Sequence, residues 1–335
     1  MVARRAGVSL GTASNVLNRP HLVSEGTRER VLRAMEELDY VPNVGARQLR
    51  QGRSHLIGVL VLDISNPFWG EVVRGAEAAA AESGHVIIVC NAGESTVKED
   101  YALRALTEHR VDGLLIAPVA EDEDRLERLQ NAGMQVVLLD YPSTRPTLRS
   151  VAVDDVQGGR LAATHLLELG HDRIAFVGST TIHWGVDRRA GVDQAFERAG
   201  LDPGTHVVEV LTAALTSAEG ERAADAIAAM DPRPTAVVCV NDVLALGVLR
   251  GLHRSGLRVP RDISLVGYDD VPFAAVLSPP LSTIQQLPYR LGETAAQLML
   301  DAMGDSPQRM DRHVVFDPNL IVRDSTAPPP VAGLR

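Results

Sequence analysis

The sequence predicts a small all-α module at the N-terminus, followed by a larger α/β domain of two lobes. Residues 1–42 read as short helices separated by tight turns. From Leu56 onward, short β-rich apolar runs alternate with amphipathic helical stretches, the pattern of a mostly parallel sheet covered by helices. A polar, basic connector at residues 43–55 separates the two parts.

The first part depends on a helix-turn-helix pattern. Ala6 and Gly7 allow two helices to cross through a short turn, Val8 fills the space between them, and Ser9 is a good N-cap for the second helix. In that helix we expect Ala13, Val16 and Leu17 to face inward. The positions left exposed, where they could meet base edges or phosphates, are Leu10, Gly11, Ser14, Asn15 and Asn18.

A third helix is expected after Ser24. Its apolar residues at core spacing are Val31, Leu32, Met35 and Leu38. Taken alone, these three helices also fit an ordinary bundle with no role in DNA binding.

The α/β part is predicted from the alternation of strand-like and helical segments. Strand-like runs occupy 56–62, 86–90, 113–117, 135–140, 174–178, 207–211, 236–240 and 263–267. Helical patterns lie near 68–84, 97–110, 122–133, 157–170, 187–200, 217–230 and 242–256. Eight strands are too many for one compact layer, so we expect two lobes with a ligand crevice at the carboxyl ends of the strands.

Composition and charge limit the class of protein. The chain has 335 residues with 45% hydrophobic and 23% charged residues, which is ordinary for a globular protein. Its net charge of −10 is uneven: residues 1–55 hold nine arginines and five acidic residues, a local charge of +4, and the remainder carries −14. The basic first segment is suited to neutralising phosphates.

Several classes of site and location are disfavoured. No apolar run reaches the roughly 18 residues that span a bilayer, and the N-terminus lacks the apolar segment of a signal peptide. No dinucleotide-binding, P-loop or nucleophile-elbow motif occurs, and Cys90 and Cys239 read as buried unpaired thiols. We therefore expect a cytoplasmic protein that is not an enzyme, needs no cofactor or metal and does not associate with a membrane.

A series of motifs then runs through nearly the whole chain in a fixed order. At the N-terminus stand Ala-Gly-Val-Ser (6–9), Thr-Ala-Ser (12–14), Val-Leu-Asn (16–18), Tyr-Val-Pro-Asn (40–43) and Ala-Arg-x-Leu (46–49). Later come Asp-Ile-Ser-Asn-Pro-Phe (63–68), His-Leu-x-x-Leu-Gly-His (165–171), Asn-Asp (241–242), Gly-Tyr-Asp-Asp (267–270) and Pro-Leu-Ser-Thr-Ile (280–284). The chain resembles the lactose-repressor (LacI/GalR) family of transcriptional regulators.

The resemblance implies a helix-turn-helix DNA reader joined to a periplasmic-binding-protein-like sensor. It places Leu10, Gly11 and Asn15 at the main base-reading positions, and it implies DNA contacts from Ser9, Thr12, Ser14 and Asn18 as well. Polar readout falls on Asn15, whose amide pairs well with adenine. The family often has arginine there, so the preferred operator is expected to differ.

The connector matches the family's hinge helix, which orders on DNA. The resemblance implies that Leu49 wedges into the minor groove beside Asn43, Ala46 and Arg47. A flexible linker with one buried leucine is the alternative. The family's first helix normally begins several residues before the match to Val2-Ala3, so we expect a true start upstream of Met1.

Polar and aromatic residues at strand ends and in first helical turns are the candidates for binding an effector. They are Phe68, Trp69, Asp140, Trp184, Arg188, Asn241, Asp242 and Asp269, with Asn66 as a further candidate. Carboxylate, amide and guanidinium groups bind hydroxyls, and an aromatic face packs on a sugar ring. Phe68 and Trp69 either contact the effector or pack the lobes together. Asn241 and Asp242 either contact it or cap a helix, and Asp63 and Asp270 are expected to be structural.

The expected domains are 1–42 for the DNA reader, 43–55 for the hinge and 56–324 for the sensor. The first lobe covers about 56–152 and 286–312, the second about 155–283 and 314–324, and a disordered tail covers 325–335.

The expected function is that of an effector-responsive repressor of a sugar operon, acting on a pseudo-palindromic operator as a homodimer. The dimer is expected to form through the first lobe, including the helices after Pro67 and Val97. A sugar-binding protein without DNA function is the alternative, but it has no use for residues 1–55.

Overall fold

The computed structural model describes residues 1–40, 53–120, 122–179, 182–304 and 311–330. The chain divides into two compact units, Met1–Ser54 and His55–Arg335. Each unit has its own buried core and is described by itself.

The N-terminal unit is a small helical fold with the expected turn. Its helices are α1 (Val2–Arg5), α2 (Leu10–Asn18), the 3₁₀ helix η1 (Pro20–Leu22) and α3 (Glu25–Glu36). Gly7 takes φ +66° in the turn between α1 and α2, a conformation that favours glycine. The Ser9 hydroxyl accepts a hydrogen bond from the Thr12 backbone N–H at 3.0 Å and so caps α2. The helix-turn-helix expected from the sequence is present.

The core of this unit is smaller than the sequence suggested. It contains Val2, Ala6, Ala13, Val16, Val31, Ala34 and Met35. Leu17 and Leu32, which we expected inside, are 40% and 39% exposed. Each directly follows a buried residue of its helix. Successive side chains on a helix point about 100° apart, so these leucines lie outside the narrow inward face of so small a bundle.

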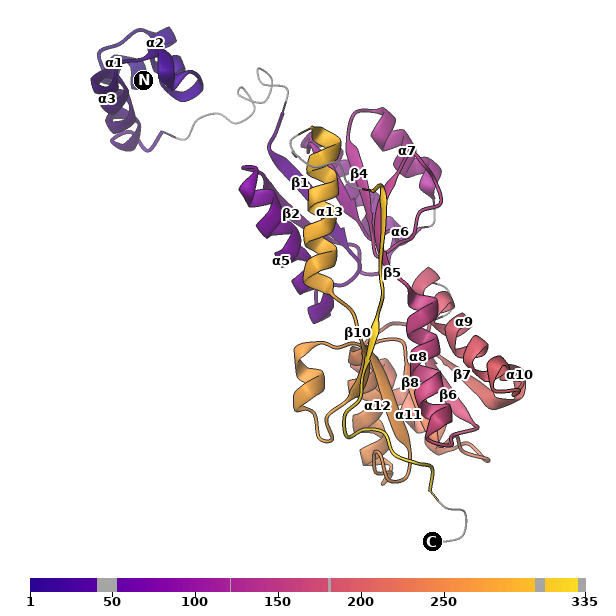
Figure 1. Ribbon diagram of the computed structural model, residues 1–335. Helices are drawn as coiled ribbons and strands as arrows, with labels where there is room; N and C mark the ends of the chain where they lie inside the picture. The colour runs from indigo at the N-terminus through magenta and orange to yellow at the C-terminus, as the bar shows by residue number, and fades with distance from the viewer. Residues whose placement is uncertain (41–52, 121, 180–181, 305–310, 331–335) are drawn as a thin grey trace. The chain divides into compact units, whose positions relative to one another are not determined.

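The larger unit contains two six-stranded sheets, and helices pack against each (Figure 1). The first sheet has the order β11-β5-β4-β3-β1-β2 and is wholly parallel. Its strands are β1 (Leu56–Val61), β2 (Val86–Asn91), β3 (Gly113–Ile116), β4 (Gln135–Leu139), β5 (Arg149–Val153) and β11 (His313–Phe316). Helices α5 (Pro67–Glu82), α6 (Thr96–Glu108), α7 (Glu123–Asn131) and α13 (Pro288–Met303) pack on it. This is the first lobe.

The second lobe is built in the same way. Its sheet has the order β12-β10-β9-β8-β6-β7, and only the β12–β10 pair is antiparallel. The strands are β6 (Ile174–Gly178), β7 (Val207–Leu211), β8 (Ala236–Cys239), β9 (Ser264–Asp269), β10 (Ser282–Gln285) and β12 (Asn319–Ile321). The helices are α8 (Asp155–Glu168), α9 (His183–Arg198), α10 (Pro203–His206), α11 (Ser217–Ala228), α12 (Asp242–Arg254) and η2 (Pro272–Val276).

The chain passes between the lobes three times. The crossings follow β5, β10 and β11, so each sheet receives strands from separate parts of the sequence. The third crossing corrects an expectation. Residues 314–316 were assigned to the second lobe, but β11 pairs with β5 in the first sheet, and the crossing comes only after Phe316. A short apolar run has no local feature that says which of two sheets it joins.

The start of the C-terminal segment also differs from the expectation of a disordered tail over residues 325–335. Ser325 is 1% exposed, its hydroxyl donates to the Leu265 carbonyl at 2.6 Å, and it accepts from the Ser282 N–H at 2.7 Å. The Ala327 carbonyl lies 2.8 Å from Nε2 of the buried His171. Residues 325–327 are therefore packed on the second lobe and are not a disordered tail. The prolines around them suggested disorder, whereas the hydrogen-bond partners are distant in sequence.

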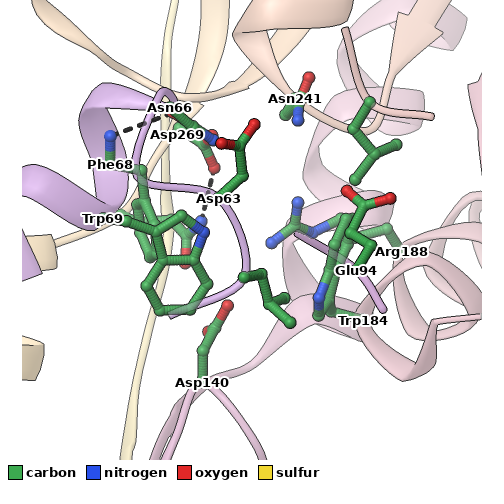
Figure 2. Close-up of a pocket in the computed structure, with 13 residues that line it drawn as sticks. Asp63, Asn66, Phe68, Trp69, Glu94, Asp140, Trp184, Arg188, Asn241 and Asp269 are labelled. Atoms are coloured by element: carbon green, nitrogen blue, oxygen red, sulfur yellow. Dashed lines mark hydrogen bonds between the residues drawn. The ribbon is translucent and has the colours of Figure 1, made fainter. Parts of the chain in front are cut away.

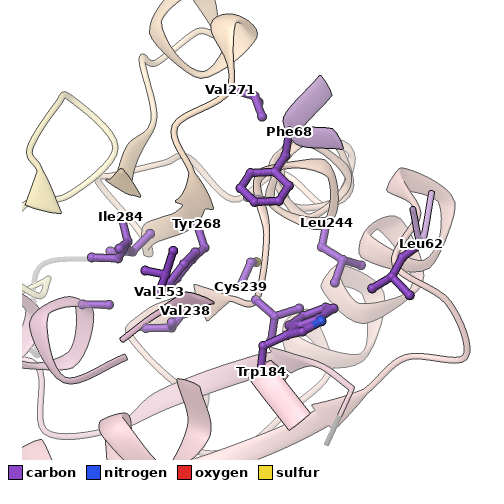
Figure 3. Close-up of a cluster of buried hydrophobic side chains, with 14 of the residues drawn as sticks. Leu62, Phe68, Val153, Trp184, Val238, Cys239, Leu244, Tyr268, Val271 and Ile284 are labelled. Atoms are coloured by element: carbon purple, nitrogen blue, oxygen red, sulfur yellow. The ribbon is translucent and has the colours of Figure 1, made fainter. Parts of the chain in front are cut away.

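The core of the larger unit continues from one lobe to the other. Buried Leu62 and Phe68 of the first lobe belong to the same cluster as Trp184, Leu244 and Tyr268 of the second (Figure 3). The carboxyl ends of β1, β4, β8 and β9 all lead to residues beside this junction, namely Leu62, Asp140, Val240 and Asp269. The topology therefore gathers side chains from both sheets at one place.

Candidate functional site

A cavity lies between the two lobes at the carboxyl ends of the strands. It encloses about 420 Å³, including the part open to solvent. Figure 2 shows Asn66, Phe68 and Trp69 from the start of α5 on one side and Trp184 and Arg188 of α9 on the other. The lining residues are Leu62, Asp63, Asn66, Phe68, Trp69, Glu94, Asp140, Trp184, Arg188, Leu215, Asn241, Asp269 and Gln286. Seven of the eight expected effector residues are brought together here.

Arg188 is held from several sides. Its Nε donates to Asp155 Oδ1 at 2.7 Å, and its Nη1 donates to the Val240 carbonyl at 2.5 Å. The guanidinium carbon lies 3.6 Å from the ring centroid of Tyr268 and 4.7 Å from that of Trp184. Tyr268 also donates its hydroxyl to Asp155 at 2.9 Å. Among the described residues, none accepts a hydrogen bond from Nη2, so this group remains available to a ligand.

Close helix packing places this network. A side chain at Gly159 of α8 would put its Cβ 1.9 Å from the Arg188 carbonyl oxygen of α9. Glycine therefore allows the two helices to approach until Asp155 and Arg188 meet. Burial alone would lower the pKa of Arg188, but the neighbouring Asp155, Tyr268, Asp269 and Asp140 hold it above its ordinary value. Arg188 stays charged.

Asp140 and Asp269 provide carboxylates from opposite lobes. Each directly follows or ends a strand, and each has a positive φ, 50° for Asp140 and 110° for Asp269. Such backbone conformations are uncommon for non-glycine residues and persist where surrounding structure enforces them. The strained turns aim both buried carboxyl groups into the cavity.

The two carboxyl groups have raised pKa values. Burial, then the charge of Asp155, raises the pKa of Asp140 to about 8, although Arg188 partly opposes this. Burial also raises the pKa of Asp269 to about 6, and Arg188 together with hydrogen bonds from Asn66 and Gln286 limits the shift. Asp140 has no such donors, since its Oδ1 lacks a hydrogen-bond partner among the described residues.

Hydrogen bonds also join the lobes through these residues. Asn66 of the first lobe donates its Nδ2 to Asp269 Oδ2 at 3.2 Å. From the second lobe, His183 Nε2 lies 2.8 Å from the Asp140 carbonyl oxygen, and its ring meets Tyr141 edge-on at 4.5 Å. Gln286, at a crossing between lobes, donates to Asp269 Oδ1 at 2.8 Å, but its own Oε1 is buried and has no hydrogen-bond partner among the residues that the structure describes. The same holds for Trp184 Nε1.

Asn241 and Asp242 have different positions. Asn241 caps α12: its Oδ1 accepts a hydrogen bond from the Leu244 N–H at 2.8 Å. Asn241 also lines the cavity. Asp242 is fully buried: its two oxygens accept from Thr283 Oγ1 at 2.7 Å and the Val271 N–H at 3.0 Å. The expectation that Asp242 contacts the effector is therefore corrected. It lies behind the cavity and ties α12 to the segments after β9 and in β10.

Sequence reasoning missed several lining residues. Glu94 and Leu215 lie in loops without a recognisable motif, and Gln286 follows a strand that the alternation did not reveal. Asp63 was expected to be structural; it lines the cavity, and it also accepts hydrogen bonds from the Ser65 N–H and hydroxyl. Asp155 has no direct place in the cavity lining but fixes Arg188. A carboxylate at the first position of α8 was the available signal.

The N-terminal unit presents a second surface, the face of α2. Leu10 is 79% exposed at the first position of the helix, and Gly11 beside it is exposed as well. Ser14 and Asn15 are half-buried, whereas the Ser9 and Thr12 hydroxyls lie 2.9 Å apart and bond to each other. Asn18 ends α2. The expected hinge residues Asn43, Ala46, Arg47 and Leu49 lie outside the described residues.

Two further structural findings concern the described residues alone. No helix among them combines the length and apolar character that crossing a membrane requires. No group of three or more histidine, cysteine, aspartate or glutamate side chains among them is arranged to hold a metal ion.

Both units match families of known proteins. Residues 2–43 match the bacterial regulatory proteins of the lacI family, and residues 163–326 match a periplasmic binding protein-like domain. The HTH-type transcriptional repressor PurR of Aliivibrio fischeri is 36% identical over 331 residues, 97% of each chain. PurR of Photobacterium profundum is 35% identical over 327 residues, again 97% of each chain.

Solved structures agree. A LacI family regulator from Enterococcus faecium with bound ribose is 32% identical with a TM-score of 0.74, covering 82% of this chain and 99% of that one. The lac repressor dimer bound to operator and the anti-inducer ONPF is 31% identical with a TM-score of 0.83, covering 97% and 98%. A helix-turn-helix unit, a two-lobed sensor and relatives of nearly equal length thus lead to one conclusion. The chain belongs to the lacI family of bacterial regulatory proteins and is a ligand-responsive, DNA-binding transcriptional repressor.

Proposed function

We propose that this repressor is controlled by an uncharged sugar that binds in the cavity between the lobes. The observation that carries the proposal is the mixture of groups lining the cavity. The carboxyl groups of Asp140 and Asp269 accept hydrogen bonds, Arg188 donates them, and Trp69 and Trp184 supply apolar ring surface. A sugar hydroxyl both donates and accepts, so it satisfies both kinds of partner at once.

The charge of the cavity favours a neutral ligand. Asp63, Glu94 and Asp269 line it together with Asp140, whose raised pKa keeps it mostly protonated near neutral pH. Arg188 is the cation among the described lining residues, and Asp155 already pairs with it. A phosphate or carboxylate on the ligand would meet this excess of acidic groups. A nucleobase offers fewer donors to the carboxyl groups than a sugar ring does. The relative with bound ribose supports the same ligand class.

Binding is coupled to DNA through lobe orientation in this proposal. Ligand contacts come from both lobes, and the pairs Asn66–Asp269 and His183–Asp140 already bridge them. A ligand that joins the same residues stabilises one orientation over others. That orientation sets the geometry with which two DNA readers meet the two halves of an operator.

The dimer is proposed to form through the first lobe. Strand β2 is the end strand of its sheet, and Val86 and Val89 on it are 61% and 41% exposed. Val97 and Tyr101 of the adjoining α6 are 74% and 72% exposed. Apolar side chains gathered on an edge strand and its neighbouring helix mark a surface that a second copy covers. The related lac repressor structure is a dimer.

DNA reading is assigned to α2 and to the hinge. Asn15 reads an adenine edge, Leu10 contacts a thymine methyl group, and Gly11 permits close approach. Leu49, with Asn43, Ala46 and Arg47, is assigned to the minor groove. Ser9, Thr12, Ser14 and Asn18 contribute contacts to phosphates or base edges. The protein acts in the cytoplasm and does not convert its ligand.

Two measurements test the proposal. Selection from a random duplex pool is expected to enrich a pseudo-palindrome. Titration of that duplex complex with ribose, glucose, galactose, ribose 5-phosphate and hypoxanthine is expected to change operator affinity with a neutral sugar alone. Response to the phosphate or to the base instead would overturn the assignment of the ligand class.

A further inference from the structure

The second and third crossings between the lobes run side by side (Figure 1). The second leaves β10 after Gln285 and enters α13 at Pro288. The third leaves β11 after Phe316 and enters β12 at Asn319. In the second lobe the two are joined by the antiparallel pairing of β10 with β12. In the first lobe the guanidinium carbon of Arg290 lies 5.5 Å from the ring centroid of Phe316. The two crossings are therefore tied together at both ends.

Two adjacent aspartates at the end of β9 bind two adjacent glutamines where the second crossing begins. Asp269 Oδ1 accepts a hydrogen bond from Gln286 Nε2 at 2.8 Å, and both residues line the cavity. Asp270 Oδ2 accepts one from Gln285 Nε2, also at 2.8 Å, and neither of these is among the described lining residues. Strands β9 and β10 are parallel neighbours in which Asp269 lies opposite Gln285. One pair of side chains thus belongs to the cavity and the next pair lies outside it.

The outer pair is also connected to the third crossing, through Arg323. This arginine follows β12, and its Nη2 donates to Asp270 Oδ1 at 2.6 Å. Its Nη1 donates to the Leu281 carbonyl at 2.7 Å, and its backbone N–H donates to Ser282 Oγ at 2.9 Å, so it also holds the start of β10. The side chains of Arg323 and Asp270 are 19% and 12% exposed, so solvent weakens this ion pair less than a surface pair. We call Asp270, Gln285 and Arg323 the Asp270 link.

The backbone couples the two aspartates. Asp269 and Asp270 are consecutive residues with positive φ, 110° and 56°. Non-glycine residues keep such conformations where the surrounding structure enforces them. A shift of the Asp269 carboxyl group is therefore passed on to Asp270, because the enforced turn leaves little freedom for rotation between them.

We propose that Asp270 is a positioning residue that passes effector binding at Asp269 on to the orientation of the lobes. The inference rests on the proposed function, because it takes the cavity as the effector site. A ligand that binds Asp269 competes with Gln286 for the carboxyl group and so alters the start of the second crossing. The Asp270 link makes the third crossing follow the second. Without the link the ligand still binds, but the change stays within one crossing and the lobes keep their orientation.

Operator binding by the full chain tests the link. Fluorescence anisotropy gives the operator Kd with and without ribose, glucose or galactose, and the ratio of the two values is the response to that sugar. Asp270→Asn keeps the shape of the side chain and removes its charge, and it is expected to reduce the response about fivefold or more. Operator affinity without sugar, and sugar affinity of the free protein by calorimetry, are expected to stay within about twofold of the natural values. A general loss of stability does not produce this split.

A second variant and a matched control isolate the link. Gln285→Met removes the other hydrogen bond without leaving a charge unpaired, so it carries the test if Asp270→Asn fails to fold. The double variant is expected to lose no more of the response than either single variant, because both cut the same link. Asp262→Asn is the control. Asp262 accepts from Arg258 at 2.8 and 3.1 Å between α12 and β9, so this change breaks an aspartate–arginine pair of the same lobe away from the crossings.

The outcomes separate this inference from the proposed function. If the variants keep the full response, or if Asp262→Asn loses as much of it, the inference is wrong and the sugar cavity stands. Amide hydrogen exchange of residues 285–289 and 316–320 needs no ligand: Asp270→Asn is expected to exchange there about tenfold faster or more, and unchanged exchange also overturns the inference. If no sugar alters operator affinity of the natural chain but exchange rises as expected, the sugar assignment fails and the Asp270 link is supported.

Discussion

At the residue scale, Arg188 combines a structural and a binding role. It is 3% exposed, it forms an ion pair with Asp155, and it lies between the rings of Tyr268 and Trp184. We expect Arg188→Met to abolish sugar binding and to cost about 3–5 kcal/mol of unfolding free energy, because it leaves Asp155 buried and unpaired. Adding Asp155→Asn is expected to restore most of the stability and none of the binding. Urea unfolding and calorimetry check both; recovery of ligand affinity in the double variant would contradict a direct ligand contact.

Asp140 makes stability depend on pH. Its pKa of about 8 in the folded protein lies above the ordinary value of 3.8, so the folded state keeps a proton that the unfolded chain has lost. The stabilisation from this group is therefore complete below about pH 4, declines as the pH rises and is gone by about pH 8. Asp140→Asn is expected to raise the Tm relative to the natural chain, by little at pH 5 and by more at pH 8. Parallel Tm curves for the two proteins across this range would refute the raised pKa.

At the element scale, different faces of α2 serve the stability of the N-terminal unit and the recognition of DNA. Its inward residues Ala13 and Val16 are buried, and Asn15 between them lies on the side that remains partly open. We expect Asn15→Ala to lower affinity for the selected operator by about 10- to 100-fold, as loss of a bidentate base contact does. Binding to unrelated DNA is expected to stay the same. Electrophoretic mobility shifts measure this, with Glu29→Ala on the exposed face of α3 as the control.

Strand β2 and helix α6 give the second prediction at this scale. Tyr101→Asp places a charge in the exposed apolar group that we assign to the dimer interface. The expected result is a monomer in sedimentation velocity. Operator affinity is expected to fall at least tenfold, and the Tm measured in the presence of the ligand is expected to stay unchanged. Val322→Asp places the same charge at an apolar residue elsewhere that is 58% exposed, against 72% for Tyr101, and serves as the control. A dimer that survives Tyr101→Asp would move the interface away from α6.

The elements themselves show what local sequence does and does not determine. Segments such as 56–62 and 174–178 were predictable because an apolar run between turn residues needs no distant partner to be recognised as a strand. Strand β5 and helix α13 were not among the expected elements: Arg149–Val153 mixes polar and apolar residues, and the helix that starts at Pro288 was overlooked although proline is favoured at the first helical position. Site residues with a motif, such as Asn66 and Arg188, were found. Glu94 and Gln286 were missed because their place in the cavity depends on how loops and crossings pack.

At the scale of the whole molecule, the C-terminal segment fastens the second lobe. Ser325 bridges the Leu265 carbonyl and the Ser282 N–H from a position that is 1% exposed. Ser325→Ala leaves both groups without their partner, which we expect to lower the unfolding free energy by about 1–3 kcal/mol. The exposed neighbour Asp324→Ala is expected to have little effect. Urea unfolding followed by circular dichroism measures both, and equal stabilities would show that the segment is only loosely attached.

The three crossings between the lobes also govern the order in which the protein can be made. The first sheet lacks its end strand until β11 has been synthesised, and the second lacks β12 until residue 321. Helix α13, which packs against α5, likewise arrives more than 200 residues after it. A ribosome therefore releases neither lobe in finished form before almost the entire chain has emerged. A prematurely terminated chain that carries a complete DNA reader cannot complete either half of the sensor that controls it.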